Sequence, residues 1–190
     1  ILAKKEGLKN VLVTNGQINK EPLKELMGYI DAANVDLKSM DKKYYRNILK
    51  GDLETTQNTI RLLKKNNIHV EITFLTVTNN NDKPQMMEDL SRWIASVSKS
   101  IPLHISAYYP AYKLHEPPTS AETIFRNWKI ASKYLQFVYV GNIIDKDKSN
   151  TRCPNCNEIL IKRHGYNTKK LMDGNLCPSC GTEIAGRYHV

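Results

Sequence analysis

The sequence predicts an α/β protein in which a parallel sheet with helical crossovers is followed by a small metal-binding module. The first observation is that residues 10–142 repeat one pattern, a short β-rich segment followed by an amphipathic helix. The second is that polar residues follow each β-rich segment, and the third is that all four cysteines fall after residue 150. Strands alternating with helices form parallel sheets, either open and doubly wound or as part of an α/β barrel.

The composition indicates a soluble globular protein. At 190 residues, with 41% hydrophobic and 25% charged residues, the chain can hold one domain and a small appendage. No apolar run has the length of a transmembrane helix, and no signal-peptide pattern is present. We therefore expect a cytoplasmic location and no membrane partner.

The charge alone does not identify a partner. The formal net charge is +9, and basic surfaces attract nucleic acids. The lysines are scattered along the predicted helices, however, which is more typical of a solvated face than of a binding patch. Nucleic acid is therefore the less favoured partner.

The first residues resemble the end of a helix. Residues 1–7 have the pattern of last helical turns closed by a glycine, Gly7. Because a domain rarely starts within a helix, we expect this sequence to be the C-terminal piece of a longer protein.

Five segments have the composition of strands and end at turn residues. In the longest, Val70, Ile72 and Phe74 fall on one face, and Glu71, Thr73 and Leu75 fall on the other. The predicted strands are residues 10–14, 33–38, 69–77, 102–107 and 136–140.

Proline and capping residues indicate where each predicted helix begins, and the spacing of apolar residues indicates which of its faces is buried. A helical turn is predicted over residues 44–49 and ends before Gly51. The other predicted helices begin at Pro22, at the N-cap Asp52, at Asp82 with Pro84, and at a capping box from Thr119 to Glu122. The helix after Pro84 is expected to bury Met86, Leu90, Trp93, Ile94 and Val97.

The second strand carries the leading site candidate. Asp36 and Lys38 are two residues apart, so they project from one face while Val35 and Leu37 project from the other. An ion pair beside a buried strand costs desolvation unless something polar meets it. The residues alone leave two interpretations open, a structural ion pair and a binding site.

Other polar residues are expected at the same edge of the sheet. Ligands of α/β proteins bind at the carboxyl ends of the strands. The segments that follow the predicted strands, and that define a candidate pocket floor, are Thr14-Asn15-Gly16, Asp36 with Lys38, residues 79–82, the aromatic loop 108–112 that contains Tyr109, and Gly141-Asn142.

The cysteines have the spacing of a four-thiolate metal site. Cys153 and Cys156 are separated by residues 157–176 from Cys177 and Cys180, which matches structural zinc sites closely. Two disulfides are disfavoured because nothing marks the chain as secreted, and a redox dithiol is disfavoured because neither pair starts a helix after a strand. An iron site with the same ligands remains open.

The cysteine pairs also suggest the division of the chain. The segment between them has the pattern of a hairpin, with Ile159-Leu160-Ile161 as a strand and Gly165-Tyr166 as its turn. We predict a partial barrel over residues 1–142, a polar linker over 143–150, and a four-cysteine zinc-knuckle domain over 151–190.

Taken in order, these segments resemble the C-terminal two thirds of the AmmeMemoRadiSam-system radical SAM enzymes, relatives of the pyruvate formate-lyase activating enzyme. The resemblance covers nearly the whole chain. It rests on the order of the following segments: residues 12–16, Val35-Asp36-Leu37-Lys38, Val70-Glu71-Ile72, residues 102–106, Tyr109-Pro110, residues 139–142 and the knuckle at 151–156.

The resemblance implies a partial (β/α) barrel of radical SAM type that binds S-adenosylmethionine across its strand ends, where a [4Fe-4S] cluster cleaves it to a 5′-deoxyadenosyl radical. By the same resemblance, Asp36 and Lys38 correspond to the pair that holds the ribose and carboxylate region. The other implied cofactor-binding residues are Thr14, Asn15, Gly16 and Tyr109.

The sequence also departs from that family. The cluster motif Cys-x-x-x-Cys-x-x-Cys and the Gly-Gly-Glu segment are absent, and Tyr109 stands where activating enzymes carry a histidine. We therefore expect this chain to be inactive alone and the cluster to be present only in the full-length protein. A protein could be the substrate or partner, and the alternative function is a basic zinc-ribbon module that binds nucleic acid or protein.

Overall fold

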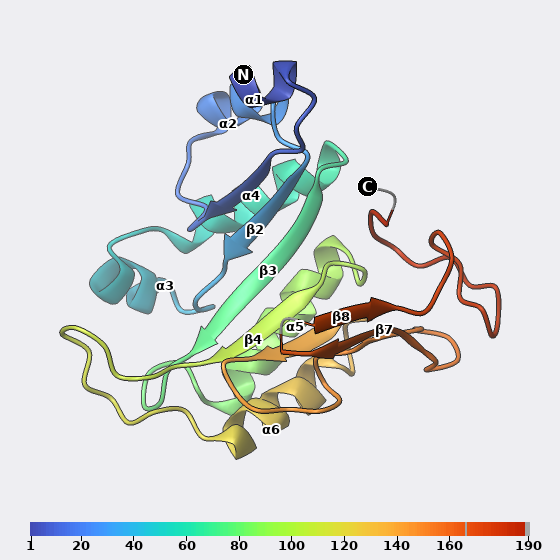
Figure 1. The fold of residues 1–190 in the computed structure, drawn as a ribbon. Coiled ribbons are helices and arrows are strands. Elements are labelled where there is room, and N and C mark those ends of the chain that lie inside the picture. The colour runs from blue at the N-terminus through green and yellow to red at the C-terminus, as the bar shows by residue number, and fades with distance from the viewer. Residues whose placement is uncertain (166, 189–190) are drawn as a thin grey trace.

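The computed structural model describes residues 1–165 and 167–188 and contains a five-stranded parallel sheet (Figure 1). The strands lie in chain order, β1-β2-β3-β4-β5, and each pairs in parallel with the next. Their bounds are Val11–Thr14 for β1, Ala32–Asp36 for β2, His69–Thr76 for β3, Leu103–Ala107 for β4 and Val138–Gly141 for β5.

The main helices cover one face of this sheet. In Figure 1, α4, α5 and α6 lie on the side opposite to the C-terminal strands. The helices are α1 (Leu2–Lys5), α2 (Lys20–Met27), α3 (Lys42–Tyr44), α4 (Leu53–Lys65), α5 (Pro84–Val97) and α6 (Ala121–Ala131). A sequential strand order with the crossover helices on one face is the arrangement of a barrel wall, whereas a doubly wound sheet carries helices on both faces.

The two faces of the sheet differ in polarity because side chains alternate along each strand. On β3, Val70, Ile72 and Phe74 are at most 2% exposed and contact the helices. The other face carries partly exposed polar side chains. We call this second face the open face; its polar residues are Asn34, Asp36, His69, Glu71, Thr73, His104, Ser106 and Tyr139.

All five predicted strands and the predicted helix after Pro22 are present, with small differences in their bounds. The predicted turn at 44–49 begins at the last residue of α3 and contains a π-helical turn, η1 (Tyr45–Leu49), which is followed by Lys50 with a φ of 54°. Asp52 caps α4 as predicted, since its carboxylate accepts a 2.7 Å hydrogen bond from the Thr55 N–H.

Three details of the predicted helices are wrong. Lys83, not Asp82, is the N-cap of α5. Met87 is fully buried, whereas Met86, Trp93 and Val97 of the predicted stripe are only partly buried. The capping box is displaced by one residue, because Ser120 caps α6 by accepting from Thr123 N–H.

The four cysteines lie in a second unit with its own small core. Strands β6 (Thr151–Arg152), β7 (Ile159–His164) and β8 (Asn167–Lys170) form an antiparallel sheet. Its buried cluster includes Leu160, Ile161 and Ile184, together with Phe137, the residue before β5. The predicted hairpin is therefore present; Tyr166, predicted in its turn, lies outside the described residues. We call residues 151–188 the four-cysteine segment.

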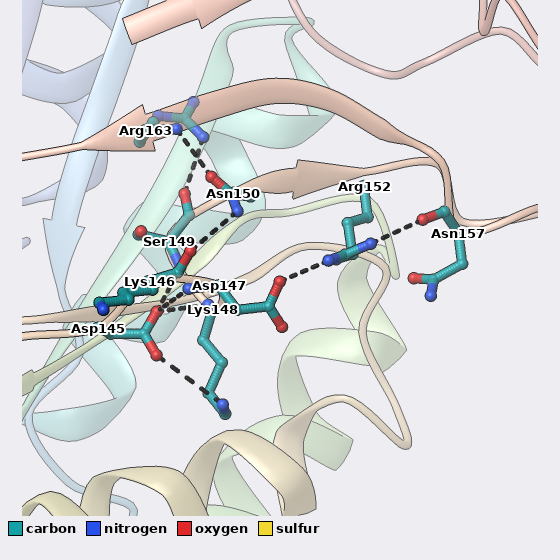
Figure 2. Close-up of polar contacts among 9 residues, drawn as sticks. All are labelled: Asp145, Lys146, Asp147, Lys148, Ser149, Asn150, Arg152, Asn157 and Arg163. Atoms are coloured by element: carbon teal, nitrogen blue, oxygen red, sulfur yellow. Dashed lines mark hydrogen bonds and ion pairs between the residues drawn. The ribbon is translucent and has the colours of Figure 1, made fainter. Parts of the chain in front are cut away.

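The polar residues between the two units form a set of hydrogen bonds rather than an extended tether (Figure 2). Asp145 Oδ2 accepts from the N–H groups of residues 147, 148 and 149. Arg152 pairs with Asp147, and the Asn150 side-chain oxygen accepts from the Arg163 N–H at 2.7 Å. These contacts join residues 145–150 to β6 and β7.

Among the described residues, no helix combines the length and the apolar character needed to cross a membrane.

Candidate functional site

The open face brings the polar residues of four strands together. Asn34 lies opposite Glu71 in the register of β2 and β3, and Thr73 lies opposite both Asp36 and His104. The Thr73 hydroxyl donates a 2.8 Å hydrogen bond to Asn34 Oδ1. Since the helices bury the other face, this surface is where the sheet can meet a polar ligand.

Asp36 and Lys38 form an ion pair at the carboxyl end of β2. Lys38 Nζ lies 2.9 Å from Asp36 Oδ2, and each side chain is 32% exposed. Val35 and Leu37, on the opposite side, are fully buried. The predicted alternation is therefore confirmed, and both charged groups keep solvent-facing positions for further hydrogen bonds.

The backbone around Lys38 is fixed by two buried side chains, those of Tyr45 and of Asn81, which belongs to the predicted pocket-floor segment 79–82 but lies inside the fold. The Asn81 amide donates to Lys38 O and to Leu75 O, and its oxygen accepts from Val77 N–H. The Lys38 N–H donates to the Tyr45 hydroxyl at 3.2 Å. Asn81 is 2% exposed, so these hydrogen bonds are inside the fold and hold the ends of β2 and β3 together. A lone Asn in a loop gives no sequence signal for this role.

The turn at Thr14, Asn15 and Gly16 lies at the neighbouring strand end but faces α4. Thr14 is opposite Val35 in the register, so it shares the helix-covered side, and its hydroxyl accepts from Gly16 N–H. The Gly16 carbonyl accepts from Thr59 Oγ1 at 2.8 Å. Asn15 is the exposed member of the turn. The structure thus pairs Asp36 with Lys38 and directs Thr14 and Gly16 into the β1–α4 contact.

Tyr109 lies in the loop after β4 and connects two strand-end loops. Its hydroxyl donates a 3.0 Å hydrogen bond to the Asn142 carbonyl, and the side chain is 56% exposed. The Asn142 side chain in turn donates to Ala107 O. These bonds place the Tyr109 ring at the rim of the sheet beyond β4 and β5.

A second cluster on the open face was not predicted. Glu71 Oε1 lies 3.1 Å from His69 Nε2, and Glu71 Oε2 lies 2.7 Å from His104 Nε2. The hydrogen bonds from His104 and His69 lower the pKa of Glu71 well below its ordinary value. His104 stacks on Tyr139, with ring centroids 5.2 Å apart. The sequence feature that could have indicated this cluster is a histidine at the open-face position of each of two adjacent strands, His69 on β3 and His104 on β4.

The four cysteines converge as their spacing predicts. Their Sγ atoms lie within 4.8 Å of one another, and all four thiols are free. The Cys153–Cys180 and Cys156–Cys177 Sγ distances are 3.6 and 3.5 Å. A tetrahedral tetrathiolate zinc site has sulfurs about 3.8 Å apart, from Zn–S bonds of about 2.3 Å. The donor set therefore fits a metal ion of that kind.

Both cysteine pairs use the same turn. The residue after each pair has positive φ, 65° at Asn157 and 70° at Gly181. Its N–H donates at 2.9 Å to the carbonyl of the first cysteine of the pair, Cys153 or Cys177. Hydrogen bonds from the hydroxyl and backbone of Thr182 lower the pKa of the Cys180 thiol.

Known sequences resemble this chain. Residues 1–94 match the sequence model of the radical SAM superfamily. An uncharacterised protein of Methanocaldococcus jannaschii is 38% identical over 191 residues, which cover 97% of this chain and 56% of that protein. The chain thus spans little more than half the length of this curated relative.

Solved structures share the fold. A domain of the pyruvate-formate lyase-activating enzyme from Bacteroides vulgatus has a TM-score of 0.64 and 19% identity, covering 73% of this chain and 84% of that one. Streptococcus suis SuiB bound to S-adenosylmethionine has a TM-score of 0.58 and 11% identity, covering 73% and 34%. The predicted fold class is confirmed as a partial (β/α) barrel of radical SAM type with a four-cysteine knuckle.

Proposed function

We propose that this chain, as a relative of the radical SAM enzymes, binds S-adenosylmethionine at the carboxyl end of β2. The observation that carries the proposal is the Asp36–Lys38 pair on the open face. A carboxylate can accept from two ribose hydroxyls, and an ammonium can meet the carboxylate of the methionine part. Because Asn81 and Tyr45 hold the Lys38 backbone, the pair is positioned before a ligand arrives.

The radical-generating cluster does not fit the residues of this chain. Residues 1–152 contain no cysteine, and the four that follow converge on one another in the four-cysteine segment. We therefore propose that these 190 residues are the C-terminal portion of a longer radical SAM enzyme whose other portion ligates the [4Fe-4S] cluster. The 56% coverage of the Methanocaldococcus relative supports this proposal. The coding sequence upstream of Ile1 tests it directly, since a Cys-x-x-x-Cys-x-x-Cys motif is expected there.

Calorimetric titration of the full-length protein with S-adenosylmethionine tests the contact residues. Asp36→Asn and Lys38→Ala each remove one charged hydrogen-bonding group, and we expect about a tenfold loss of affinity or more. The matched controls are Glu54→Gln and Lys65→Ala, which change the same charges on the exposed surface of α4. Unchanged affinity in both site variants would contradict the assignment.

We further propose that the four cysteines bind zinc and that the metal has a structural role. A site closed by four protein ligands has no open coordination position for a substrate. Elemental analysis of the purified full-length protein tests this assignment, and we expect one equivalent of zinc per chain in addition to the iron of the [4Fe-4S] cluster. Absence of zinc from protein in which the four cysteines are metal-bound would overturn the assignment.

A second candidate function is supported by the β7–β8 hairpin. Lys162 lies directly opposite Lys169, and Lys169 and Lys170 are exposed on β8. Three lysines on one small hairpin could contact a nucleic acid backbone. Salt-dependent retention of the protein on a nucleic-acid column, lost in a Lys162→Gln and Lys169→Gln double variant, is the expected result. Equal retention of the double variant would remove this candidate.

A further inference from the structure

A cavity separates the open face of the sheet from the four-cysteine segment. Its volume is about 570 Å³, which lies in the range of small-molecule sites. The sheet contributes Glu71, His104 and Tyr139, and the four-cysteine segment contributes Arg163 and Tyr188. Asp36, Lys38 and the four cysteines do not line it, so it is distinct from both sites proposed above.

The acidic groups of this cavity already have partners. Both Glu71 carboxylate oxygens accept from imidazoles, those of His69 and His104. Asp145 is turned toward its own backbone, where it accepts from three consecutive N–H groups, and it lies 3.8 Å from Lys148 Nζ. Neither carboxylate is therefore left to balance the arginines.

The arginines of the cavity, by contrast, have only neutral partners among the described residues. Arg163 Nη1 donates to Ser149 O at 3.0 Å and to Thr151 Oγ1 at 2.8 Å, while its guanidinium lies 5.3 Å from the centre of the Tyr139 ring. Arg187 donates to the Asn67 carbonyl. A partly buried cation without a counter-ion bears a desolvation cost. An anion in the cavity would offset this cost.

The guanidinium of Arg163 is also held in place for such a contact. Figure 2 shows its side chain directed toward Ser149 and Asn150, and the Arg163 N–H is bonded to Asn150 Oδ1. Two contacts use Nη1, which leaves the remaining N–H groups of its planar fork for a carboxylate or a phosphate. Apolar side chains of Pro102, Phe137 and Ile161 complete the walls, and they suit a ligand with an apolar body.

We propose that this cavity binds a small organic anion, a carboxylate or a phosphate ester, with the Arg163 guanidinium as its main contact. The inference goes beyond the proposed binding of S-adenosylmethionine and does not depend on it. A ligand here would lie between the sheet and the four-cysteine segment and would contact both.

Calorimetry on the zinc-loaded protein, in the absence of S-adenosylmethionine, tests the proposal. The probes are succinate and phenyl phosphate, with uncharged succinamide as the comparison. We expect succinate or phenyl phosphate to bind at millimolar concentrations or below, and succinamide not to bind. Preference between the two anions distinguishes a carboxylate ligand from a phosphate. Absence of binding by both anions would overturn the proposal.

Two variants with the same change of charge separate a specific contact from general attraction to a basic protein. Arg163→Gln is expected to weaken binding about tenfold or more, because it removes charged hydrogen bonds. Lys129→Gln, at an exposed position of α6 away from the cavity, is expected to bind as the unaltered protein does. Equal weakening in both variants would contradict a defined site.

Arg163 also holds residues 149–151, so Arg163→Gln could loosen the four-cysteine segment. NMR titration of the unaltered protein avoids this difficulty. The imidazole C–H signals of His69 and His104, assigned by His→Gln variants, are expected to shift when succinate or phenyl phosphate is added, while that of His115 stays constant. Shifts at His115 alone, or at all three, would place the anion outside the cavity and overturn the proposal.

Discussion

At the scale of single residues, buried side-chain hydrogen bonds decide where the strand ends lie. Asn81 makes three such bonds while 2% exposed. Asp36 and Lys38, in contrast, make an exposed-edge ion pair of the kind that contributes little stability. We therefore expect substitutions of Asp36 or Lys38 to affect ligand binding more than stability, and substitutions of Asn81 to affect stability.

We predict that Asn81→Ala lowers the free energy of unfolding by about 2–4 kcal/mol, because it leaves Val77 N–H and the Lys38 and Leu75 carbonyls without this partner. Urea denaturation measures the change. The control, Asn80→Ala, removes only a local bond to Thr78 O and should stay within about 1 kcal/mol. Similar effects of the two variants would contradict the role given to Asn81.

Glu71 gives a pH-dependent prediction. Because its pKa in the folded protein is lowered, its contribution to stability is present above the ordinary carboxyl pKa of about 4.5 and is lost as the pH falls below it. Glu71→Gln should therefore lower the free energy of unfolding at pH 7. The difference in unfolding free energy from the unaltered protein should shrink as the pH falls below about 4.5.

Urea denaturation at pH 7, 5 and 3 measures this difference. Glu25→Gln on the exposed surface of α2 is the control. A stability difference for Glu71→Gln that grew on acidification would show that the imidazole contacts do not stabilise the ionised carboxylate.

At the scale of elements, most strands and helices could be predicted because β-rich runs and apolar spacing are local properties. The capping of α6 was displaced because Thr119 is used elsewhere. Its hydroxyl donates to Thr76 O and accepts from Tyr108 N–H, so Ser120 becomes the cap. Such competition between a local cap and a distant strand is not visible in a capping motif.

The junction between β1 and α4 depends on Gly16. Its φ is 73°, and a Cβ atom there would lie 3.0 Å from both Thr56 Cγ2 and Val35 Cγ1. We predict that Gly16→Ala costs about 1–3 kcal/mol of unfolding free energy. Gly28→Ala, at a right-handed position where the nearest atom is 3.9 Å away, should be tolerated. Thermal or urea denaturation of both variants measures this, and equal stabilities would contradict the steric argument.

At the scale of the whole molecule, two hydrophobic clusters divide the protein. The larger lies between the sheet and its helices, and the smaller includes Cys153 and Cys177 themselves. The Tyr139 hydroxyl contacts Thr151 Oγ1 at 2.9 Å, and Phe137 packs into the smaller cluster. The four-cysteine segment is thus fastened to the open face through β5.

Removal of the metal should destabilise the four-cysteine segment and leave the parallel sheet folded. We predict that a chelator, or the variant Cys153→Ser with Cys156→Ser, removes hydrogen-exchange protection from β7 and β8 while β2 to β4 stay protected. The reason is that the metal stabilises a segment whose own core is small. Loss of protection in the central strands as well would show that the two units unfold together, and full protection of β7 would show that the metal is not needed.

The sequence by itself determined the strand and helix periodicity, the two faces of β2 and the cysteine array, because period-two alternation and ligand spacing are properties of short segments. Only the tertiary structure decided that Thr14 and Gly16 face α4, that Glu71 lies between His69 and His104, and that the four-cysteine segment covers part of the open face. Each of these depends on which distant segments become neighbours. The cavity at Arg163 belongs to this second group, since its walls come from strands on both sides of the linker.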